Sequence, residues 1–236
     1  MSQTNSFKLR GIRSVIANNM RASLANSAQL TLFSEVDATA LLSAKNKMKA
    51  AGAGIGIEDI VGVAVCKALD KNSALRARLE NRQVQLSDQT DLCFAIATDA
   101  GLMAPTVFNA GTMELAELSA TRKDLTLRAK NNNLTKEELV GGNFTISNLG
   151  LTPVTHFTPI IKQPQVAILG IGTITERVVL ASRGPTSHPA MHLSLTIDHQ
   201  LIDGLPGGLF LGDLQDLLEN CEPWVLKDHS ASGQDS

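Results

Sequence analysis

The start of the chain places its hydrophobic side chains with two different periods. In RGIRSVIANNMRASLANS, apolar residues recur every three or four positions, which is typical of one face of an amphipathic helix. These residues are Ile12, Val15, Ile16, Met20 and Leu24. The following QLTLFSEVDA nearly alternates apolar and polar residues, which predicts a strand. We therefore expect a helix that leads directly into a strand.

Helical spacing returns twice in the next part of the chain. Asp37 is expected to cap a helix that runs to about Met48, and the flexible segment AGAGIG follows it. From Ile57 to Leu69 the apolar residues again recur at helical spacing, and two acidic residues suit the positive first turn of that helix. The second helix should be largely buried.

The rest of the chain is richer in strands. QVQLS and DLCFAIATD are predicted strands, followed by the turn-rich GLMAPTV, a helix over 113–127 and a short helix opened by the capping-box pair Thr135 and Glu138. Four more segments predict strands: GNFTISNLG, QVAILGIG, TERVVLAS and AMHLSLTID. A helix over 206–218 follows the last of them.

This order of elements favours an α+β fold, a two-layer sandwich with a mixed β-sheet, because strands and helices do not alternate as a doubly wound sheet requires. No internal repeat, low-complexity tract or linker divides residues 7–226, so we expect one domain there. The polar residues 1–6 and the stretch KDHSASGQDS, residues 227–236, are expected to be disordered tails.

Composition excludes several classes of partner. The formal net charge of −2 gives the whole protein no attraction for nucleic acid or an anionic membrane surface. No apolar run approaches the roughly 18 residues that span a bilayer, and the start lacks a signal-peptide pattern. Cys66, Cys93 and Cys221 have no CxxC spacing, which favours a reduced, cytoplasmic setting. We expect neither nucleic acid nor membrane as a partner.

One histidine lies at the end of a predicted strand, in LTIDHQLIDGLPGG. Strand alternation would carry His199 to the apolar side, where it would be partly desolvated and in its neutral, basic form. A histidine on an apolar face is, however, more often a buried structural residue. Asp203 and Gly204 predict a tight turn into the last helix, in which Asp203 could serve as a cap alone.

His199, Asp203 and Gly204 match the HxxxDG signature of the CoA-dependent acyltransferase superfamily. Four other stretches support the match: GGNFTISNLG, whose Ser147 lies 52 residues before His199, FTPIIKQPQVAILGIG, DAGLMAPTV and GIRSVIANNMRASL. From about residue 7 to residue 226 the chain resembles the catalytic domain of the dihydrolipoamide acyltransferases, the core components of the 2-oxoacid dehydrogenase complexes. The resemblance implies a chloramphenicol acetyltransferase-like fold. One departure is Gln200, where the family often has arginine, so any salt bridge made by that arginine is absent.

The resemblance also implies the chemistry. An acyl group would move between dihydrolipoamide and coenzyme A, and His199 would deprotonate the attacking thiol, whose ordinary pKa is about 8.5. Ser147 would stabilise the oxyanion, Asp203 and Gly204 would hold the turn that aims His199, and Asn148 would shape the turn after Ser147. ISNLG and FTPII look more like acetyl-transferring members than succinyl ones. The residues that contact coenzyme A stay unassigned.

Partners follow from the same resemblance. In the family the site lies between subunits of a homotrimer, with His199 from one subunit and Ser147 from its neighbour, and trimers assemble into cubic or dodecahedral cores. Lipoyl and subunit-binding domains would precede residue 7, and the sequence shows neither. We therefore expect the lipoyl group on a separate domain or partner, together with the other subunits of a pyruvate or acetoin dehydrogenase complex.

Two alternative functions stay open. The chain could be a structural core or scaffold without activity, against which the intact His199, Ser147 and Asp203 argue. A chloramphenicol-acetylating enzyme usually has paired histidines where this chain has Asp198 and His199.

His156, in a loop near the family's substrate channel, could touch substrate. The remaining histidines lack metal-ligand spacing, so no metal is expected. The acyl group and the size of the assembly are not decided by the sequence.

Overall fold

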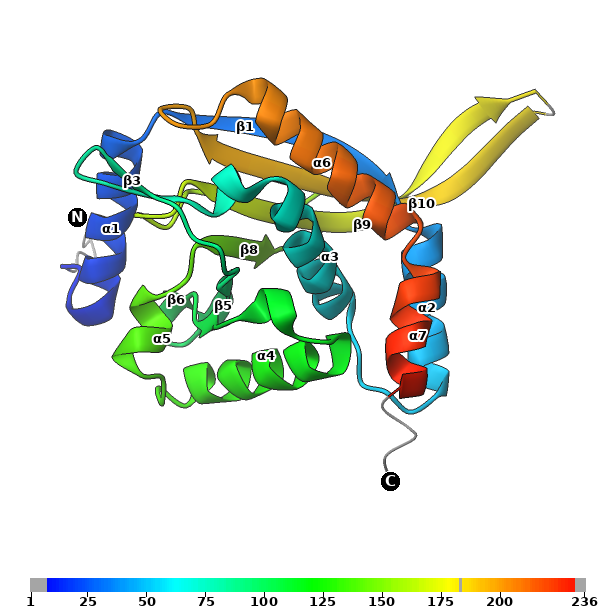
Figure 1. Ribbon diagram of the computed structural model, residues 1–236, viewed down its shortest axis with the longest axis horizontal. Coiled ribbons are helices and arrows are strands. Elements are labelled where there is room, and N and C mark those ends of the chain that lie inside the picture. Colours follow the sequence, from blue (N-terminus) through cyan, green and yellow to red (C-terminus); the bar gives the residue numbers. More distant parts are fainter. Residues whose placement is uncertain (1–7, 183, 232–236) are drawn as a thin grey trace, which may run out of the picture.

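The computed structural model describes residues 8–182 and 184–231 (Figure 1). Its centre is a six-stranded sheet in the order β1-β10-β9-β8-β4-β7. The strands are β1 (Gln29–Asp37), β4 (Leu92–Phe94), β7 (Thr106–Val107), β8 (Phe144–Asn148), β9 (Ala167–Ala181) and β10 (Gly184–Asp198). β8 is parallel to both of its neighbours, and the other pairs are antiparallel, so the sheet is mixed, as predicted.

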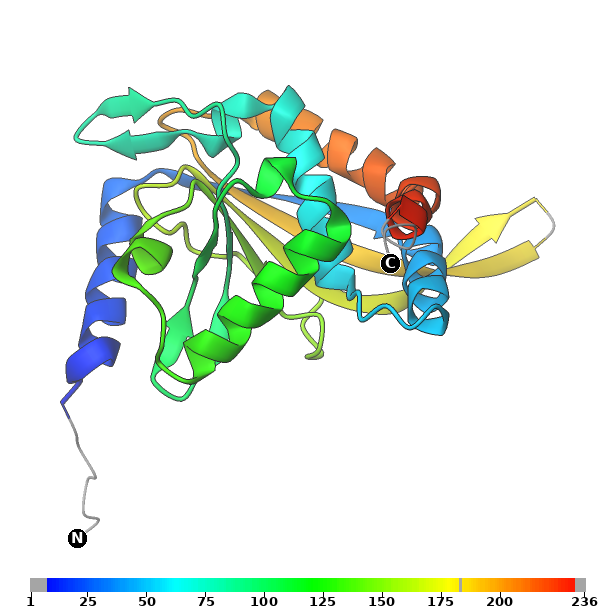
Figure 2. The same cartoon turned by 60° about the horizontal axis from the view of Figure 1, so that its bottom comes forward.

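Helices cover one face of this sheet (Figures 1 and 2). α6 packs on β1 and on α3, α4 packs on α3, and α2 packs on α7. The helices are α1 (Gly11–Asn26), α2 (Thr39–Ala50), α3 (Ile57–Lys71), α4 (Leu115–Lys130), α5 (Lys136–Val140), α6 (Gly204–Glu219) and α7 (Glu222–Ala231). Two small hairpins, β2 (Arg78–Glu80) with β3 (Gln83–Gln85) and β5 (Ile96–Thr98) with β6 (Gly101–Met103), lie outside the main sheet. The arrangement is the predicted α+β sandwich.

The core lies between the sheet and the helices. Leu193, Leu195 and Ile197 of β10 are fully buried, as their alternation predicts. Phe144 of β8 meets Phe210 of α6 with ring centroids 5.7 Å apart. α3 is buried along most of its length, also as predicted, because sheet, α4 and α6 surround it.

The far ends of β9 and β10 extend beyond the body as a two-stranded arm (Figure 1). QVAILGIG and TERVVLAS were expected as separate strands, but they form the single strand β9, which pairs with β10 almost from end to end. Val178 and Leu180 on the arm are 68% and 86% exposed. Neither strand of the arm touches the core, so its sequence shows little of the alternation that a half-buried strand would have.

Three other boundaries differ from the sequence-based expectation. DLCFAIATD splits into β4 and β5 at Ala95, whose N–H donates to Ile146 of β8 and so leaves the β5 hairpin free to turn away. α6 begins two residues before Pro206. Residues 227–231, predicted as disordered, continue α7, which the buried Val225 anchors. Residues 1–6 and 232–236 lie outside the described part of the chain. Within that part, no helix is long and apolar enough to cross a bilayer.

Candidate active site

His199 lies directly after the last residue of β10, in the turn that leads to α6. Its backbone N–H donates to the carbonyl of Ala28, 2.8 Å away, which ties the turn to the start of β1. Its side chain is 44% exposed in the single chain. The strand alternation ends at Asp198, because the strand itself ends there, so His199 does not lie on the buried apolar side as expected. The alternative of a buried structural histidine is wrong for the same reason.

Asp203 faces the imidazole of His199. Its Oδ1 lies 3.4 Å from Nδ1 of His199, longer than a hydrogen bond but close enough for the carboxylate charge to act on the ring. Asp203 occupies the N-cap position of α6, yet its side chain accepts no capping hydrogen bond from the helix. An anion at Nδ1 favours the tautomer that carries its proton there and leaves Nε2 free to accept a proton.

Gly204 and Gly207, two of the glycines near this turn, differ in what surrounds them. Gly204 opens α6, and no atom lies within 4 Å of the place where its Cβ would be. The single chain therefore gives no steric reason for the expected turn-shaping role of Gly204. A Cβ on Gly207 would lie 2.7 Å from Cδ1 of Leu32, so Gly207 is what lets α6 pack closely on β1. Its place in a GLPGG run was the only hint of this in the sequence.

Asp198 and Gln200 hold the backbone on both sides of His199. The carboxylate of Asp198, which is almost fully buried, accepts from the backbone N–H groups of Ala28 and Gln200, each 3.1 Å from Oδ1. The side-chain Nε2 of Gln200 donates to both Asp198 oxygens, at 3.1 and 3.2 Å, and to the carbonyl of Asn26 at 2.9 Å. Among the described residues no cation pairs with Asp198, and its carboxylate is held by neutral donors.

Ser147 lies near the end of β8, at the parallel pairing with Gly170 of β9. Its side chain is half-buried, and none of the hydrogen bonds found in the described chain uses its hydroxyl. In the next position, Oδ1 of Asn148 accepts the N–H of Gly150 at 2.8 Å, so Asn148 forms the turn that the sequence predicts. The turn leaves the Ser147 hydroxyl free for another partner.

A single chain does not bring Ser147 and His199 together. Ser147 pairs with Gly170, and Gly170 pairs with Ser194 of β10, which is five residues before His199. Two strand spacings of about 4.8 Å and five residues at about 3.3 Å each separate the two backbones by roughly 19 Å. Their side chains cannot bridge that span. A reaction that needs both groups therefore needs a second copy of the chain.

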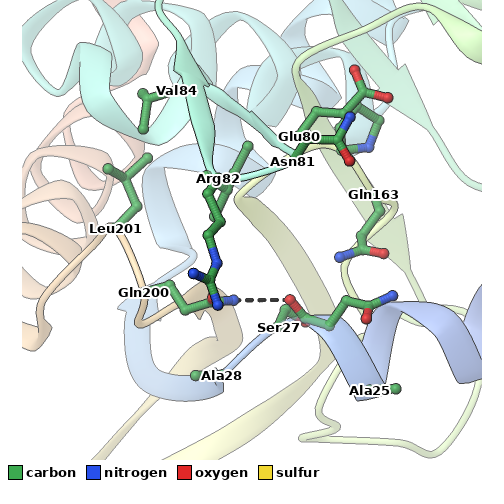
Figure 3. Close-up of a pocket in the computed structure, with 13 residues that line it drawn as sticks. Ala25, Ser27, Ala28, Glu80, Asn81, Arg82, Val84, Gln163, Gln200 and Leu201 are labelled. Carbon is green, nitrogen blue, oxygen red and sulfur yellow. Dashed lines mark hydrogen bonds between the residues drawn. The ribbon is translucent and has the colours of Figure 1, made fainter.

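A groove of roughly 1250 Å³ opens beside the His199 turn (Figure 3). Gln200 and Leu201 form one side of it, and the β2–β3 hairpin forms another, from which Arg82 extends toward the side of Gln200. The lining residues are Ala25, Asn26, Ser27, Ala28, Leu79, Glu80, Asn81, Arg82, Val84, Gln163, Pro164, Gln200 and Leu201. His199 is not among them. The amide side chains make the groove polar without giving it a strong charge.

A smaller pocket, of about 250 Å³, is lined by Asn148 and by residues of α3 and α4. Arg122 of α4 lines it and pairs with Glu58 at 2.9 Å and with Asp59 at 2.6 Å. Asp59 is fully buried and also accepts from the hydroxyl of Ser119 at 2.9 Å. Burial raises the pKa of Glu58 above its ordinary value, and the nearby Arg122 opposes that rise. Arg122 is therefore paired within this pocket, and Lys130 is a second cation that lines it.

His156 lies on the sheet face away from the helices. Its ring stacks on His192 with centroids 4.3 Å apart and meets Phe33 edge-on at 5.6 Å. Burial and the neighbouring His156 lower the pKa of His192. Sequence spacing gave no sign that these two histidines meet. Within the described residues, no group of three or more histidine, cysteine, aspartate or glutamate side chains is arranged to hold a metal ion.

The chain matches known proteins over nearly its whole length. Residues 1–226 match the model of the 2-oxoacid dehydrogenases acyltransferase (catalytic domain) family. A succinyltransferase component of the 2-oxoglutarate dehydrogenase complex from Buchnera aphidicola is 34% identical, with 93% of this chain and 55% of the relative covered. An acetyltransferase component of the pyruvate dehydrogenase complex from Mycobacterium bovis is 36% identical, with 90% and 40% covered. The chain thus spans about half the length of the curated relatives it matches.

Solved structures resemble the fold equally well. Azotobacter vinelandii dihydrolipoamide acetyltransferase, studied for the role of a serine, a histidine and an asparagine in its catalytic mechanism, has a TM-score of 0.87 at 26% identity. The cubic core of the pyruvate dehydrogenase multienzyme complex gives the same values. In both cases 95% of this chain and 94% of the other are covered. A chloramphenicol acetyltransferase, at 20% identity and a TM-score of 0.55, shares the fold. This chain belongs to the 2-oxoacid dehydrogenases acyltransferase (catalytic domain) family.

Proposed function

We propose that this chain transfers an acyl group between a dihydrolipoyl thioester and coenzyme A. The observation that carries the proposal is the placement of His199: solvent-accessible, with a carboxylate at Nδ1 and Nε2 left to accept a proton. The A. vinelandii enzyme supports the assignment, because its serine precedes its histidine by 52 positions and its asparagine follows by four. Ser147 and Asp203 stand at the same intervals from His199.

The proposed step is a thioester exchange. Nε2 of His199 takes the proton from the incoming thiol, and the resulting thiolate forms a bond to the thioester carbonyl carbon. The hydroxyl of Ser147 from a neighbouring copy donates to the oxygen that becomes negative. The original carbon–sulfur bond then breaks, and the departing thiolate receives the proton from the imidazolium. A base of this kind contributes about 10²–10⁴-fold to the rate.

The assembly we propose is a homotrimer, as the family resemblance implies. The roughly 19 Å between Ser147 and His199 of one chain supports a site that takes one residue from each of two copies. Trimers would assemble further into a core of a dehydrogenase complex, as the similar cubic core does. The lipoyl group would come from a lipoyl domain on another segment or protein. The three free cysteines fit a reducing compartment, and we infer the cytoplasm.

We infer acetyl as the transferred group. ISNLG and FTPII, which look more like those of acetyl-transferring members, support this choice. In the pocket next to Asn148, Arg122 is paired with Glu58 and Asp59, and Lys130 is the other cation that lines it. Relatives of both substrate types match the chain. Turnover of acetyl- and succinyl-dihydrolipoamide with coenzyme A, compared as kcat/KM, tests the choice. Preference for the succinyl substrate would overturn it.

The function itself is tested by His199→Ala and Ser147→Ala beside the unchanged chain. We expect the unchanged chain to acetylate coenzyme A, and both variants to lose at least about 100-fold in kcat while keeping the native mass. An unchanged chain of full native mass with no turnover, given several acyl groups, would instead indicate the scaffold alternative.

A further inference from the structure

We propose that Gln200 is a positioning residue for His199, and that it works as a neutral clamp between Asp198 and Asn26. The inference rests on the proposed function. It concerns how the imidazole is oriented, since Gln200 bonds to neither ring nitrogen of His199 and to no reacting group. Its side chain lies instead at the wall of the large groove, with the amide turned toward the backbone of the turn (Figure 3).

In this clamp one donor nitrogen bonds acceptors on two different residues. Nε2 of Gln200 reaches the carbonyl of Asn26 at 2.9 Å and both carboxylate oxygens of Asp198 at 3.1 and 3.2 Å. Asn26 ends α1, and Asp198 ends β10. One amide nitrogen therefore ties the end of β10, next to His199, to the end of α1.

Because Asp198 is buried, its carboxylate depends on the few hydrogen-bond donors around it, including Nε2 of Gln200. The carboxylate is 3% exposed and is served by two backbone N–H groups and by the Gln200 amide, with no cation among the described residues. A buried carboxylate that loses one of few donors draws the backbone toward another donor or toward water. Either shift moves the Cα of His199, which is held on its other side by the bond to Ala28.

Glutamine also differs from arginine in charge. An arginine that bonded the same partners would add a positive charge next to the Asp198 carboxylate. Gln200 holds the turn without that charge.

The test compares Gln200→Glu, Gln200→Arg and the unchanged chain in the acetyl-transfer assay, with Gln83→Glu as a matched control. Gln200→Glu keeps the size of the side chain, removes the donor and adds a negative charge beside Asp198, whereas Gln200→Arg keeps the donors. Gln83 is an exposed residue of β3 whose side chain makes no hydrogen bond found in the described chain. We expect Gln200→Glu to lose about 10- to 100-fold in kcat with KM for both substrates and native mass unchanged. Gln200→Arg should stay within about threefold of the unchanged chain.

Other results would overturn the inference. Full kcat in Gln200→Glu, or an equal loss in Gln83→Glu, would show that the clamp does not position His199. A lower melting temperature together with a raised KM, without a change in kcat, would show a structural role only. If Gln200→Glu does not assemble, Gln200→Asn, which keeps the amide but is one methylene shorter, decides by the same criterion. Absence of turnover in the unchanged chain would overturn the proposed function itself, and this inference with it.

Discussion

Oδ1 of Asp203 lies 3.4 Å from Nδ1 of His199, although the two side chains are 83% and 44% exposed. Such an exposed pair is weakly coupled, because solvent screens both charges. We therefore infer that the carboxylate contributes mainly by orienting the ring, with its oxygen facing Nδ1. Asp203 is an orienting group in the proposed mechanism, and proton transfer belongs to His199 alone.

Replacement of Asp203 by asparagine tests this division of roles. The amide oxygen of Asp203→Asn can still accept from Nδ1, so we expect kcat to fall by less than about tenfold, as one exposed contact loses its charge. Asp203→Ala, which removes the acceptor, should lose more. Steady-state kinetics at pH 7 measure both. A loss in Asp203→Asn as large as that in His199→Ala would show that the carboxylate takes part in proton transfer.

The separation of Ser147 and His199 predicts complementation between two inactive variants. When His199→Ala and Ser147→Ala chains are unfolded, mixed and refolded together, some interfaces pair an intact His199 with an intact Ser147 of the other variant. Random mixing at equal amounts gives about a quarter of the sites both groups, so about a quarter of the activity should return. Each variant refolded alone controls for residual turnover. Mixed oligomers that stay inactive would contradict a site shared between copies.

The sequence predicted the elements around this site better than the site itself. Alternation in β10 correctly placed Leu195 and Ile197 in the core, because every second side chain of a strand points to the same face of the sheet. The same rule failed at His199, since periodicity holds only while the strand lasts and nothing local marks its end at Asp198. The hydrogen bond from Nε2 of Gln200 to the carbonyl of Asn26 joins residues 174 positions apart and has no pattern in the sequence.

Sequence motifs predicted more of the candidate site than local helix and strand patterns did. HxxxDG pointed to His199 and Asp203 without any statement about their geometry, and the stacking of His156 on His192 could not be foreseen from their spacing. Ala95 illustrates the limit for strands: DLCFAIATD is a continuous apolar run, and the change of partner that breaks it comes from β8, which lies far along the chain. Long-range pairing decides such points.

Ser194 is expected to be a weak point of the fold. Its hydroxyl oxygen is buried and has no hydrogen-bond partner among the described residues. Ser194→Ala removes that unsatisfied group and should raise the free energy of unfolding by about 1 kcal/mol, with activity kept. Thr196→Val on the same strand should lower it by a similar amount, because Thr196 bonds to Thr31 at 2.8 Å. Urea denaturation compares the two. A loss of stability in Ser194→Ala would mean that the assembled protein gives this hydroxyl a partner.

Arg122 should be among the most costly charged residues to remove. Arg122→Ala leaves the fully buried Asp59 without its cation, and we expect a loss of about 3–5 kcal/mol in the free energy of unfolding. Arg177→Ala is the matched control, because its pair with Glu35 is long, at 3.5 Å, and exposed, so the expected loss is about 1 kcal/mol or less. Chemical denaturation measures both. Equal losses in the two variants would show that the Asp59 network is not buried in solution.

The stability of the protein should fall in mild acid because of His192. Burial and the neighbouring His156 lower its pKa below the ordinary value of 6.5, with Glu35 opposing and Arg177 adding to the shift. The unfolded chain therefore binds a proton near pH 6.5 while the folded chain does not, and the contribution of His192 to stability, complete above pH 6.5, is lost as the pH falls through the lowered pKa. His192→Gln should lose less stability than the unchanged chain between pH 7.5 and 5.5 in urea denaturation. His188→Gln, on the arm, is the matched control and should follow the unchanged chain. A steeper acid loss in His192→Gln would reverse the sign argued here.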